Sequence, residues 1–173
     1  MRLRLADHEA DRAALAALWL EYLGWANDAL EAACGLRLGD AATTVAADLA
    51  HLEAYAPPLG ALLLAQDDAG ALVGCAALRA SAPGAGEFKR FYVRPAARGQ
   101  GVGAALVQAL LARAQQAGYR TVRLDSARFM TAAHAMYRAH GFEPTAPYAE
   151  SEIPPAYQPH WVFMQRPLTT FEE

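Results

Sequence analysis

The chain has 173 residues, of which 54% are hydrophobic, and a formal net charge of -3. A chain of this length and composition can bury one substantial core, which predicts a single domain. The slight negative net charge and the absence of a run of like charges argue against a nucleic-acid partner. The first residues lack the apolar core of a signal peptide, and no apolar run reaches the roughly 18 residues of a membrane helix. We therefore expect a cytoplasmic protein with no membrane partner.

The N-terminal part of the chain predicts one strand and two helices. Residues Arg2–Leu5 alternate in polarity, and Asp7 is placed to cap the helix that follows. Residues 24–40 are expected to form a looser connection. A second helix is expected from Val45 to Leu52, stopped by two prolines at 57 and 58. The apolar stripe of the first helix comprises Leu15, Leu18, Trp19 and Tyr22.

The middle of the chain predicts three strands. Apolar runs at 59–65 and 72–78 flank the turn residues 67–70, which is typical of two antiparallel strands. Residues 81–86 contain glycine and proline and are expected to form a flexible link. A third strand follows at 87–93.

A helix with a broad apolar face comes next and ends at Gly118, before a short strand at 121–125. A single helix that joins two strands of one sheet makes a right-handed unit with parallel strands. The ligand of such a unit lies at the C-terminal ends of the strands.

The last part of the chain predicts one more helix and two strands. The helix is expected over 131–140 and ends at Gly141. The strands are expected near Phe142 and over 161–165, and residues 144–159 between them are expected to form a loop.

A glycine-rich segment at 98–103 lies between the third strand and the long helix. Glycines allow the chain to bend and a ligand to approach the backbone, and a helix N-terminus attracts anions. A phosphate-binding loop of the GxxxxGK[ST] type is excluded because the only lysine, Lys89, precedes the glycines. A dinucleotide fingerprint is matched formally by Gly99, Gly101 and Ala104, with Asp125 downstream, but residues 94–98 separate it from its strand and too little chain follows.

The segment Val93-Arg94-Pro95-Ala96-Ala97-Arg98-Gly99-Gln100-Gly101-Val102-Gly103 resembles the Q/R-x-x-G-x-G/A signature of the GNAT family of acyl-CoA-dependent N-acyltransferases. Residues 133–142, AHAMYRAHGF, resemble the family's A-x-x-x-Y-x-x-x-G-F helix. The order of predicted elements is also similar. The resemblance implies the α/β (α+β mixed sheet) fold of these enzymes, a central mixed β-sheet flanked by helices, as one domain over 1–173.

The resemblance implies acetyl-CoA as co-substrate and an N-acetyltransferase activity. Family members hold the pyrophosphate with backbone N–H groups, which correspond here to Arg98, Gly99, Gln100, Gly101, Val102 and Gly103. The pantetheine arm would lie along Phe91, Tyr92 and Val93. The N–H of Val93 would then face the thioester oxygen, where a donor stabilises developing negative charge.

Tyr137 matches the tyrosine that protonates the leaving thiolate, with a packing role as the alternative. Glu87 stands where several members carry the carboxylate that takes the amine's proton, although an ordinary solvated surface carboxylate is the alternative. Met130 replaces an asparagine that contacts the cofactor in many members. Thr131 and Ser126 are candidates to replace that contact.

The acceptor site is expected between residues 24–40 and the loop 144–159. Carboxylates and aromatic rings suit a cationic amine, with solvated loop acids as the alternative. The histidines are scattered, so no metal is expected, and no serine stands in GxSxG, which favours direct transfer in a ternary complex. The candidate acceptor-binding residues are Trp25, Glu150, Glu152 and Tyr157.

We therefore predict acetyl transfer to a primary amine of a small molecule or peptide. The expected partners are the amine acceptor and, in a homodimer, a second copy of the chain. The rival from another class is a non-catalytic acetyl-CoA-binding sensor or interaction module, since a fold does not fix a function.

Overall fold

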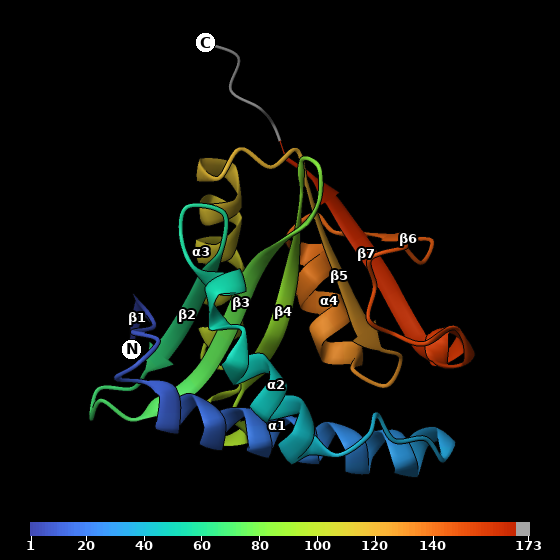
Figure 1. Ribbon diagram of the computed structural model, residues 1–173, viewed down its shortest axis with the longest axis horizontal. Coiled ribbons are helices and arrows are strands. Elements are labelled where there is room, and N and C mark those ends of the chain that lie inside the picture. The colour runs from blue at the N-terminus through green and yellow to red at the C-terminus, as the bar shows by residue number, and fades with distance from the viewer. Residues whose placement is uncertain (169–173) are drawn as a thin grey trace.

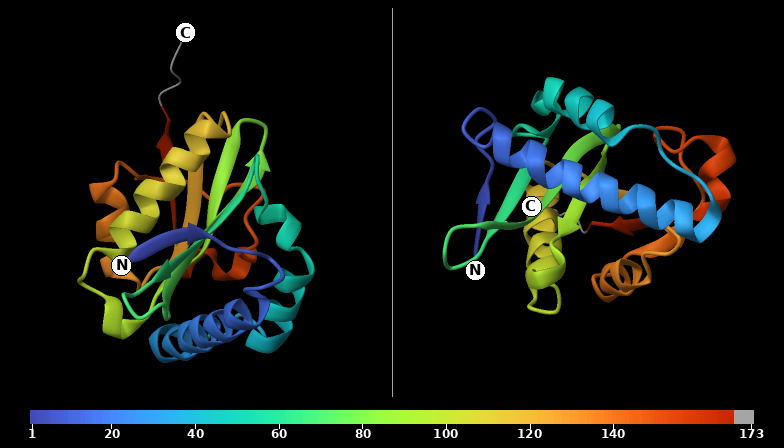
Figure 2. Two further views of the ribbon diagram at one scale, coloured as in Figure 1. Left: turned by 90° about the vertical axis from the view of Figure 1, so that its left-hand side faces the viewer. Right: turned by 90° about the horizontal axis from the view of Figure 1, so that it is seen from below.

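The computed structural model describes residues 1–168. Its seven strands form one mixed sheet in the order β1-β2-β3-β4-β5-β7-β6, with α1 and α2 on one face and α3 and α4 on the other (Figures 1 and 2). This is the mixed α/β sheet that the sequence predicts. The helices are α1 Arg12–Cys34, α2 Ala41–Ala50, α3 Val102–Gln116 and α4 Thr131–Ala139. The strands are β1 Arg2–Leu5, β2 Ala61–Gln66, β3 Leu72–Ala82, β4 Ala85–Val93, β5 Thr121–Ala127, β6 Glu143–Thr145 and β7 Trp161–Pro167.

Strand β2 shows why both faces of the sheet are covered. Its side chains alternate between faces, as strand geometry requires. Leu63 packs in the apolar cluster beneath α3, whereas Leu62 and Leu64 pack in the cluster beneath α1 and α2. All three are buried. A continuous apolar run is therefore the pattern of a central strand that is buried on both sides.

The prediction of a loose connection at 24–40 is wrong, because α1 continues to Cys34 and ends at Gly35, whose φ is 73°. Gly24 costs a helix only about 1 kcal/mol relative to alanine, and the alanine- and leucine-rich residues around it outweigh that cost. Asp7 does not cap α1 either. Its carboxylate accepts the N–H groups of Glu9 and Ala10 in the preceding turn, and Asp11 is the residue at the helix N-cap.

The expected flexible link at 81–86 is a tight hairpin. β3 extends to Ala82 and β4 begins at Ala85, so only two residues form the turn, with Gly84 at φ 73°. Gly86 allows the close packing at this end, because a Cβ there would lie 2.8 Å from both Leu78 and Tyr119. Strand pairing up to the turn and close packing at Gly86 order a segment that composition alone marks as mobile.

The parallel pairing of β4 with β5 is confirmed, but it is short. The pairs run only from Ala85↔Thr121 to Glu87↔Arg123. On its other edge β4 stays paired with β3 as far as Val93. The two central strands therefore separate after Glu87, and their C-terminal ends are not bonded to each other.

The expected loop at 144–159 contains regular structure at both ends. Strand β6 reaches Thr145 and pairs with β7, and a short 3-10 helix spans Pro155–His160. Residues 146–154 are the irregular part of this segment, which we call the β6–β7 loop. No helix within residues 1–168 is long and apolar enough to cross a membrane.

A β-bulge in β4 lies just beyond the point where β4 separates from β5. Four residues of β4, from Lys89 to Tyr92, oppose three of β3, from Ala77 to Cys75. Arg90 lies within the bulge and has φ 51°, the left-handed region that costs a non-glycine residue of the order of 1–3 kcal/mol. Its guanidinium Nε donates to the carboxylate of Asp48 on α2. This ion pair fastens the bulge to the helix that covers it.

We expect Asp48→Asn to lower the free energy of unfolding by about 1.5–3 kcal/mol, because it removes a charged hydrogen bond from a largely buried guanidinium. Urea denaturation measures the change. Glu53→Gln is the control, since Glu53 pairs with His51 at the exposed surface, and it should leave the free energy unchanged. Equal stability of Asp48→Asn and the wild-type protein would show that the bulge does not need this ion pair.

Candidate active site

A cleft of about 860 Å³ opens where β4 and β5 separate. Its walls come from the C-terminal ends of both strands, from the N-terminus of α3, from α4 and from the C-terminal half of α1. This is the end of the parallel pair where the sequence predicts a ligand. Residues as far apart in the chain as Tyr22 and Trp161 thus share one cavity.

The N-terminus of α3 presents unpaired N–H groups to this cleft. The first bond at this end is donated by Ala105 to the Gly101 carbonyl, so Val102, Gly103 and Ala104 have no acceptor within the helix. Gly101 has φ 82°, and a Cβ placed on it would meet no atom within 4 Å. The backbone is therefore open to an anion. Of the expected signature residues, Arg98, Gly99, Gly101, Val102 and Gly103 line the cleft.

Gln100 is the exception among the signature residues. It does not line the cleft, and its side-chain amide donates to the Ala96 carbonyl at 2.9 Å. This bond stabilises the turn before α3. The side chain of Gln100 is thus placed for a structural task.

Arg98 connects the glycine-rich segment 98–103 to helix α1. Its Nε donates to the Val93 carbonyl at 2.9 Å, and its guanidinium lies 5.1 Å from the centre of the Trp25 ring. Cation–π contact of this kind holds both groups at the mouth of the cleft. Trp25, expected at the acceptor site, therefore also lies beside the anion-binding segment.

The free edge of β4 offers a further donor. Arg94 donates its N–H to the Val73 carbonyl on β3 at 2.8 Å. Since successive N–H groups of a strand point to opposite edges, the Val93 N–H points away from β3 and toward the cleft. Phe91 and Tyr92 line the same wall.

Tyr137 of α4 lines the cleft from the opposite side. Its ring packs edge to face against Phe91 at 5.6 Å and Phe142 at 5.8 Å, and the residue is 5% exposed. Burial raises the pKa of the Tyr137 phenol, so that the group stays protonated at neutral pH. Within residues 1–168 its hydroxyl has no hydrogen-bond partner. The group is therefore free to donate to a ligand.

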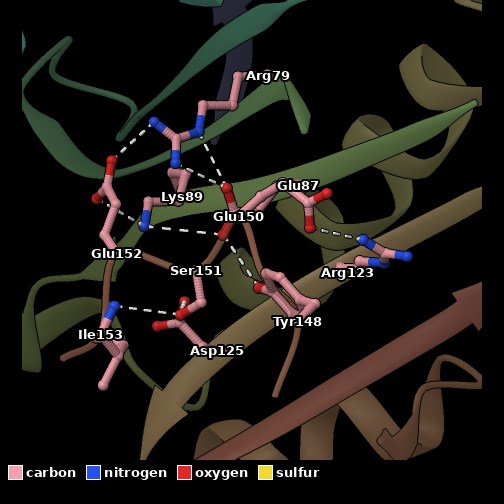
Figure 3. Close-up of polar contacts among 10 residues, drawn as sticks. All are labelled: Arg79, Glu87, Lys89, Arg123, Asp125, Tyr148, Glu150, Ser151, Glu152 and Ile153. Atoms are coloured by element: carbon pink, nitrogen blue, oxygen red, sulfur yellow. Dashed lines mark hydrogen bonds and ion pairs between the residues drawn. The ribbon is translucent and has the colours of Figure 1, made fainter. Parts of the chain in front are cut away.

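Glu87 is fully buried and does not line the cleft. Its carboxylate accepts hydrogen bonds from Arg79 at 2.9–3.0 Å and from the Tyr148 hydroxyl at 3.0 Å (Figure 3). Both oxygens are thus engaged within the protein. Of the other expected site residues, the structure brings Glu87 near Glu152, with which it shares Arg79 and Lys89, and Glu87 itself stays outside the cleft lining.

The glutamates of the β6–β7 loop also form ion pairs. Glu150 lies 3.3 Å from Arg123 and outside the cleft lining. Glu152 lines the cleft, but Arg79 at 2.8 Å and Lys89 at 3.1 Å bind its carboxylate (Figure 3). Although burial opposes the effect, these two cations lower the pKa of Glu152 to about 2. Both glutamates fasten the loop to the sheet.

Tyr157 lines the cleft as expected, and its hydroxyl donates to the Arg37 carbonyl at 3.1 Å. This bond joins the 3-10 helix before β7 to the chain that leaves α1. Tyr157 therefore presents its ring, more than its hydroxyl, to a ligand.

Met130 also lines the cleft. Its thioether accepts a contact from the Ser126 hydroxyl at 3.5 Å, and that hydroxyl lies 3.0 Å from Nε2 of buried His134. Burial lowers the pKa of His134, which favours the neutral ring. Ser126, Met130 and His134 thus fasten the end of β5 to the start of α4. No group of His, Cys, Asp and Glu residues within 1–168 is arranged to hold a metal ion.

Asp125 is the cleft residue that the sequence analysis missed as a catalytic candidate. It lies near the C-terminal end of β5 and lines the cleft. Its carboxylate lies 3.5 Å from the Ser151 hydroxyl and also faces the Trp161 side chain, and it has no cationic partner within 4.0 Å among residues 1–168. Burial raises its pKa. The signal was its position, since ligands bind at the C-terminal ends of parallel strands.

Comparison with known proteins agrees with this geometry. The model of the acetyltransferase (GNAT) domain matches residues 58–144. An "IAA acetyltransferase" of Azospirillum brasilense is 32% identical over 132 residues, which are 76% of this chain and 83% of that protein. An "uncharacterized N-acetyltransferase" of Schizosaccharomyces pombe is 38% identical over 101 residues, 58% of this chain and 62% of that protein, so the match spans less than two thirds of it.

Solved structures share the whole fold. A Klebsiella pneumoniae structure described as an acyl-CoA N-acyltransferase is 28% identical, with a TM-score of 0.67 and 97% of both chains covered. A Thermoplasma acidophilum N-acetyltransferase solved in complex with coenzyme A is 16% identical, with a TM-score of 0.71 and 96% and 98% of the two chains covered, and shows likeness of fold. Together the matched domain, the relatives and the shared fold show that this chain belongs to the GNAT family of acetyltransferases, whose acyl donor is acetyl-CoA.

Proposed function

We propose that this protein transfers the acetyl group of acetyl-CoA to a primary amine of a small molecule or peptide, directly within a ternary complex. The observation that carries the proposal is that the open N-terminus of α3, the free N–H of Val93 and the free hydroxyl of Tyr137 all face one cleft. We also propose that the sheet and its four helices act as one domain.

The donor fits the wall of the cleft that α3 and β4 form. The backbone N–H groups from Arg98 to Gly103 would hold the pyrophosphate, and the positive end of the helix dipole favours its charge. The absence of a Cβ on Gly101 leaves room for the approach. The pantetheine arm would use the unpaired edge of β4 at Phe91, Tyr92 and Val93.

Two protein groups serve the transfer itself. The Val93 N–H stabilises negative charge on the thioester oxygen. Removal of one such oxyanion donor from a serine protease raises the activation free energy by about 2.7–4 kcal/mol. The amine nitrogen forms the new C–N bond as the C–S bond breaks. Tyr137 gives its proton to the leaving sulfur and regains one from the amine nitrogen, so the products are an amide and a free thiol.

The test is to incubate the protein with acetyl-CoA and a panel of amines, and to follow thiol release together with the acetylated product. We expect release that depends on an amine and yields one amide for each thiol. Binding of acetyl-CoA with no product from any amine would favour a sensor over an enzyme.

The anion-binding role of α3 predicts a specific loss of affinity. Gly101→Asp should weaken acetyl-CoA binding at least about 100-fold, because a carboxylate would repel the pyrophosphate at close range. Calorimetry measures the dissociation constant. Gly101→Asn is the matched control, since asparagine has nearly the same shape, tolerates positive φ and carries no charge. Equal affinities of the two variants would refute an anion at this position.

The acid role of Tyr137 predicts that Tyr137→Phe lowers kcat by at least about 10²-fold. The dissociation constant of acetyl-CoA and the melting temperature should stay at their wild-type values, because the ring remains and the hydroxyl has no partner among residues 1–168. Steady-state kinetics with the best amine decides it. An unchanged kcat would leave Tyr137 with a packing role alone.

A further inference from the structure

Among residues 1–168, Asp125 is one of two carboxylates that line the cleft, and Glu152 is the other. Two cations bind Glu152, whereas the polar neighbours of Asp125 are the Ser151 hydroxyl, at 3.5 Å, and the Trp161 side chain. A partly buried carboxylate without a cationic partner is costly, and a bound ammonium group would lower that cost. The arrangement is thus complementary to a cationic ligand at this point.

The surface beside Asp125 is apolar. Alternate strand residues share a face, so Asp125 and Ala127 of β5 lie together and oppose Phe163 and Trp161 of β7 in register. This face belongs to a separate buried apolar cluster. The cluster residues and their neighbours that line the cleft include Leu30, Phe129, Ile153, Tyr157 and Trp161.

Two polar side chains on this wall, Asn27 and Tyr157, are already paired. The Asn27 amide donates to the Gly39 carbonyl at 3.0 Å, and its carbonyl accepts the Leu38 N–H at 2.8 Å. Tyr157 donates to the backbone of Arg37. A ligand body that follows this wall therefore gains apolar contact and few hydrogen bonds.

The cations near this wall are also paired. Lys89 lies 3.1 Å from Glu152, Arg90 binds Asp48, and Arg37 binds Asp28 and Glu31. Arg98 packs on Trp25 at the cofactor segment. Among the described cleft residues only Arg98, at the glycine-rich segment, is a cation without a carboxylate partner. A carboxylate on an acceptor at this apolar wall would thus meet no unpaired cation there, and it would approach Asp125 and Glu152.

We infer that Asp125 binds the acceptor's ammonium group and takes its proton, and that the acceptor is a primary amine on an apolar, flat body without an acidic group. The inference rests on the proposed function and names its acceptor. Asp125 accepts one proton from the ammonium and passes it to solvent. The free amine then forms the amide bond, and its second proton replaces the one that Tyr137 gives to sulfur.

The surroundings of Asp125 set the pH dependence. Lys89 and Glu87 approach it from β4, Glu152, Ser151 and Tyr148 from the β6–β7 loop, and Trp161 from β7. The phenols of Tyr22 on α1 and Tyr137 on α4 also face it in the cleft. Burial is the largest influence and raises its pKa, Lys89 opposes this rise, and the two glutamates add to it. Protonated Asp125 can neither bind an ammonium nor accept its proton. Activity should therefore fall as the pH drops through this raised pKa.

Three related amines test the inference in the wild-type protein. 2-Phenylethylamine has the flat body, phenylalanine adds a carboxylate to it, and ethylamine lacks the ring. We expect kcat/KM for 2-phenylethylamine to exceed both others at least about 10-fold, from like-charge repulsion in one case and lost apolar contact in the other. A kcat/KM for phenylalanine or ethylamine equal to or above that of 2-phenylethylamine would overturn the inference.

The variant Asp125→Asn tests the residue. We expect it to lower kcat/KM for 2-phenylethylamine by about 10²–10⁴-fold, to remove the acidic limb of the pH profile and to keep the acetyl-CoA dissociation constant. Asp68→Asn, the same change at an exposed turn residue, should behave as the wild-type protein. An acidic limb retained in Asp125→Asn would exclude Asp125 as the base.

Calorimetry separates failure of this inference from failure of the proposed function. If no amine is acetylated, the proposed function fails, and binding of 2-phenylethylamine to the CoA-loaded protein still tests the site. At least about 10-fold weaker binding by Asp125→Asn would support the ammonium site. Equal binding by the two proteins, or no binding by the wild-type protein, would refute it.

Discussion

The separation of β4 from β5 after Glu87 is the constraint on which the active site depends. In a continued parallel ladder, β5 would use the N–H groups along the far edge of β4. The bulge at Arg90 accompanies the departure of β4, and the Val93 N–H is left for a ligand. Since α3 begins just beyond β4, the same opening also receives the N–H groups of a helix N-terminus. One change of strand direction thus brings two kinds of donor into a single cleft.

Charge compensation below the cleft explains why buried ionic groups are tolerated there. Arg79 and Lys89 lie among Glu87 and Glu152, so two cations balance two carboxylates (Figure 3). Such a network stabilises only while every member keeps its partners. It joins β3, β4 and the β6–β7 loop, and it holds one wall of the cleft in place. Asp125 lies beside this network and has no cationic partner of its own. Its carboxylate therefore gives a negative charge to the part of the cleft where we propose that the acceptor binds.

Local sequence patterns predicted most of the fold and several of the residues that line the cleft. The signature at 98–103 and Tyr137 depend on short-range spacing, and the structure brings Gly101, Val93 and Tyr137 to one cleft. The prediction for residues 24–40 failed because a single glycine, Gly24, does not end a helix when strong helix formers surround it. Glu87 and Glu150 could not be placed because their partners, Arg79 and Arg123, lie on other strands. Whether the carboxylate of an acidic residue is available to a ligand depends on such long-range ion pairs. The spacing of residues along the chain does not reveal these pairs.

Gly103 has a consequence for how sequences of this type can vary. A Cβ at this position would lie 2.7 Å from the Met136 sulfur, one residue before Tyr137. The missing side chain on α3 is therefore filled by a thioether from α4, a flexible group that adapts to irregular gaps. The sizes of the side chains at positions 103 and 136 are therefore linked. A larger residue at 103 requires a smaller or differently oriented one at 136. Evolution of the cofactor loop is thereby coupled to the helix that carries the tyrosine, and substitutions at the two positions should covary among homologues.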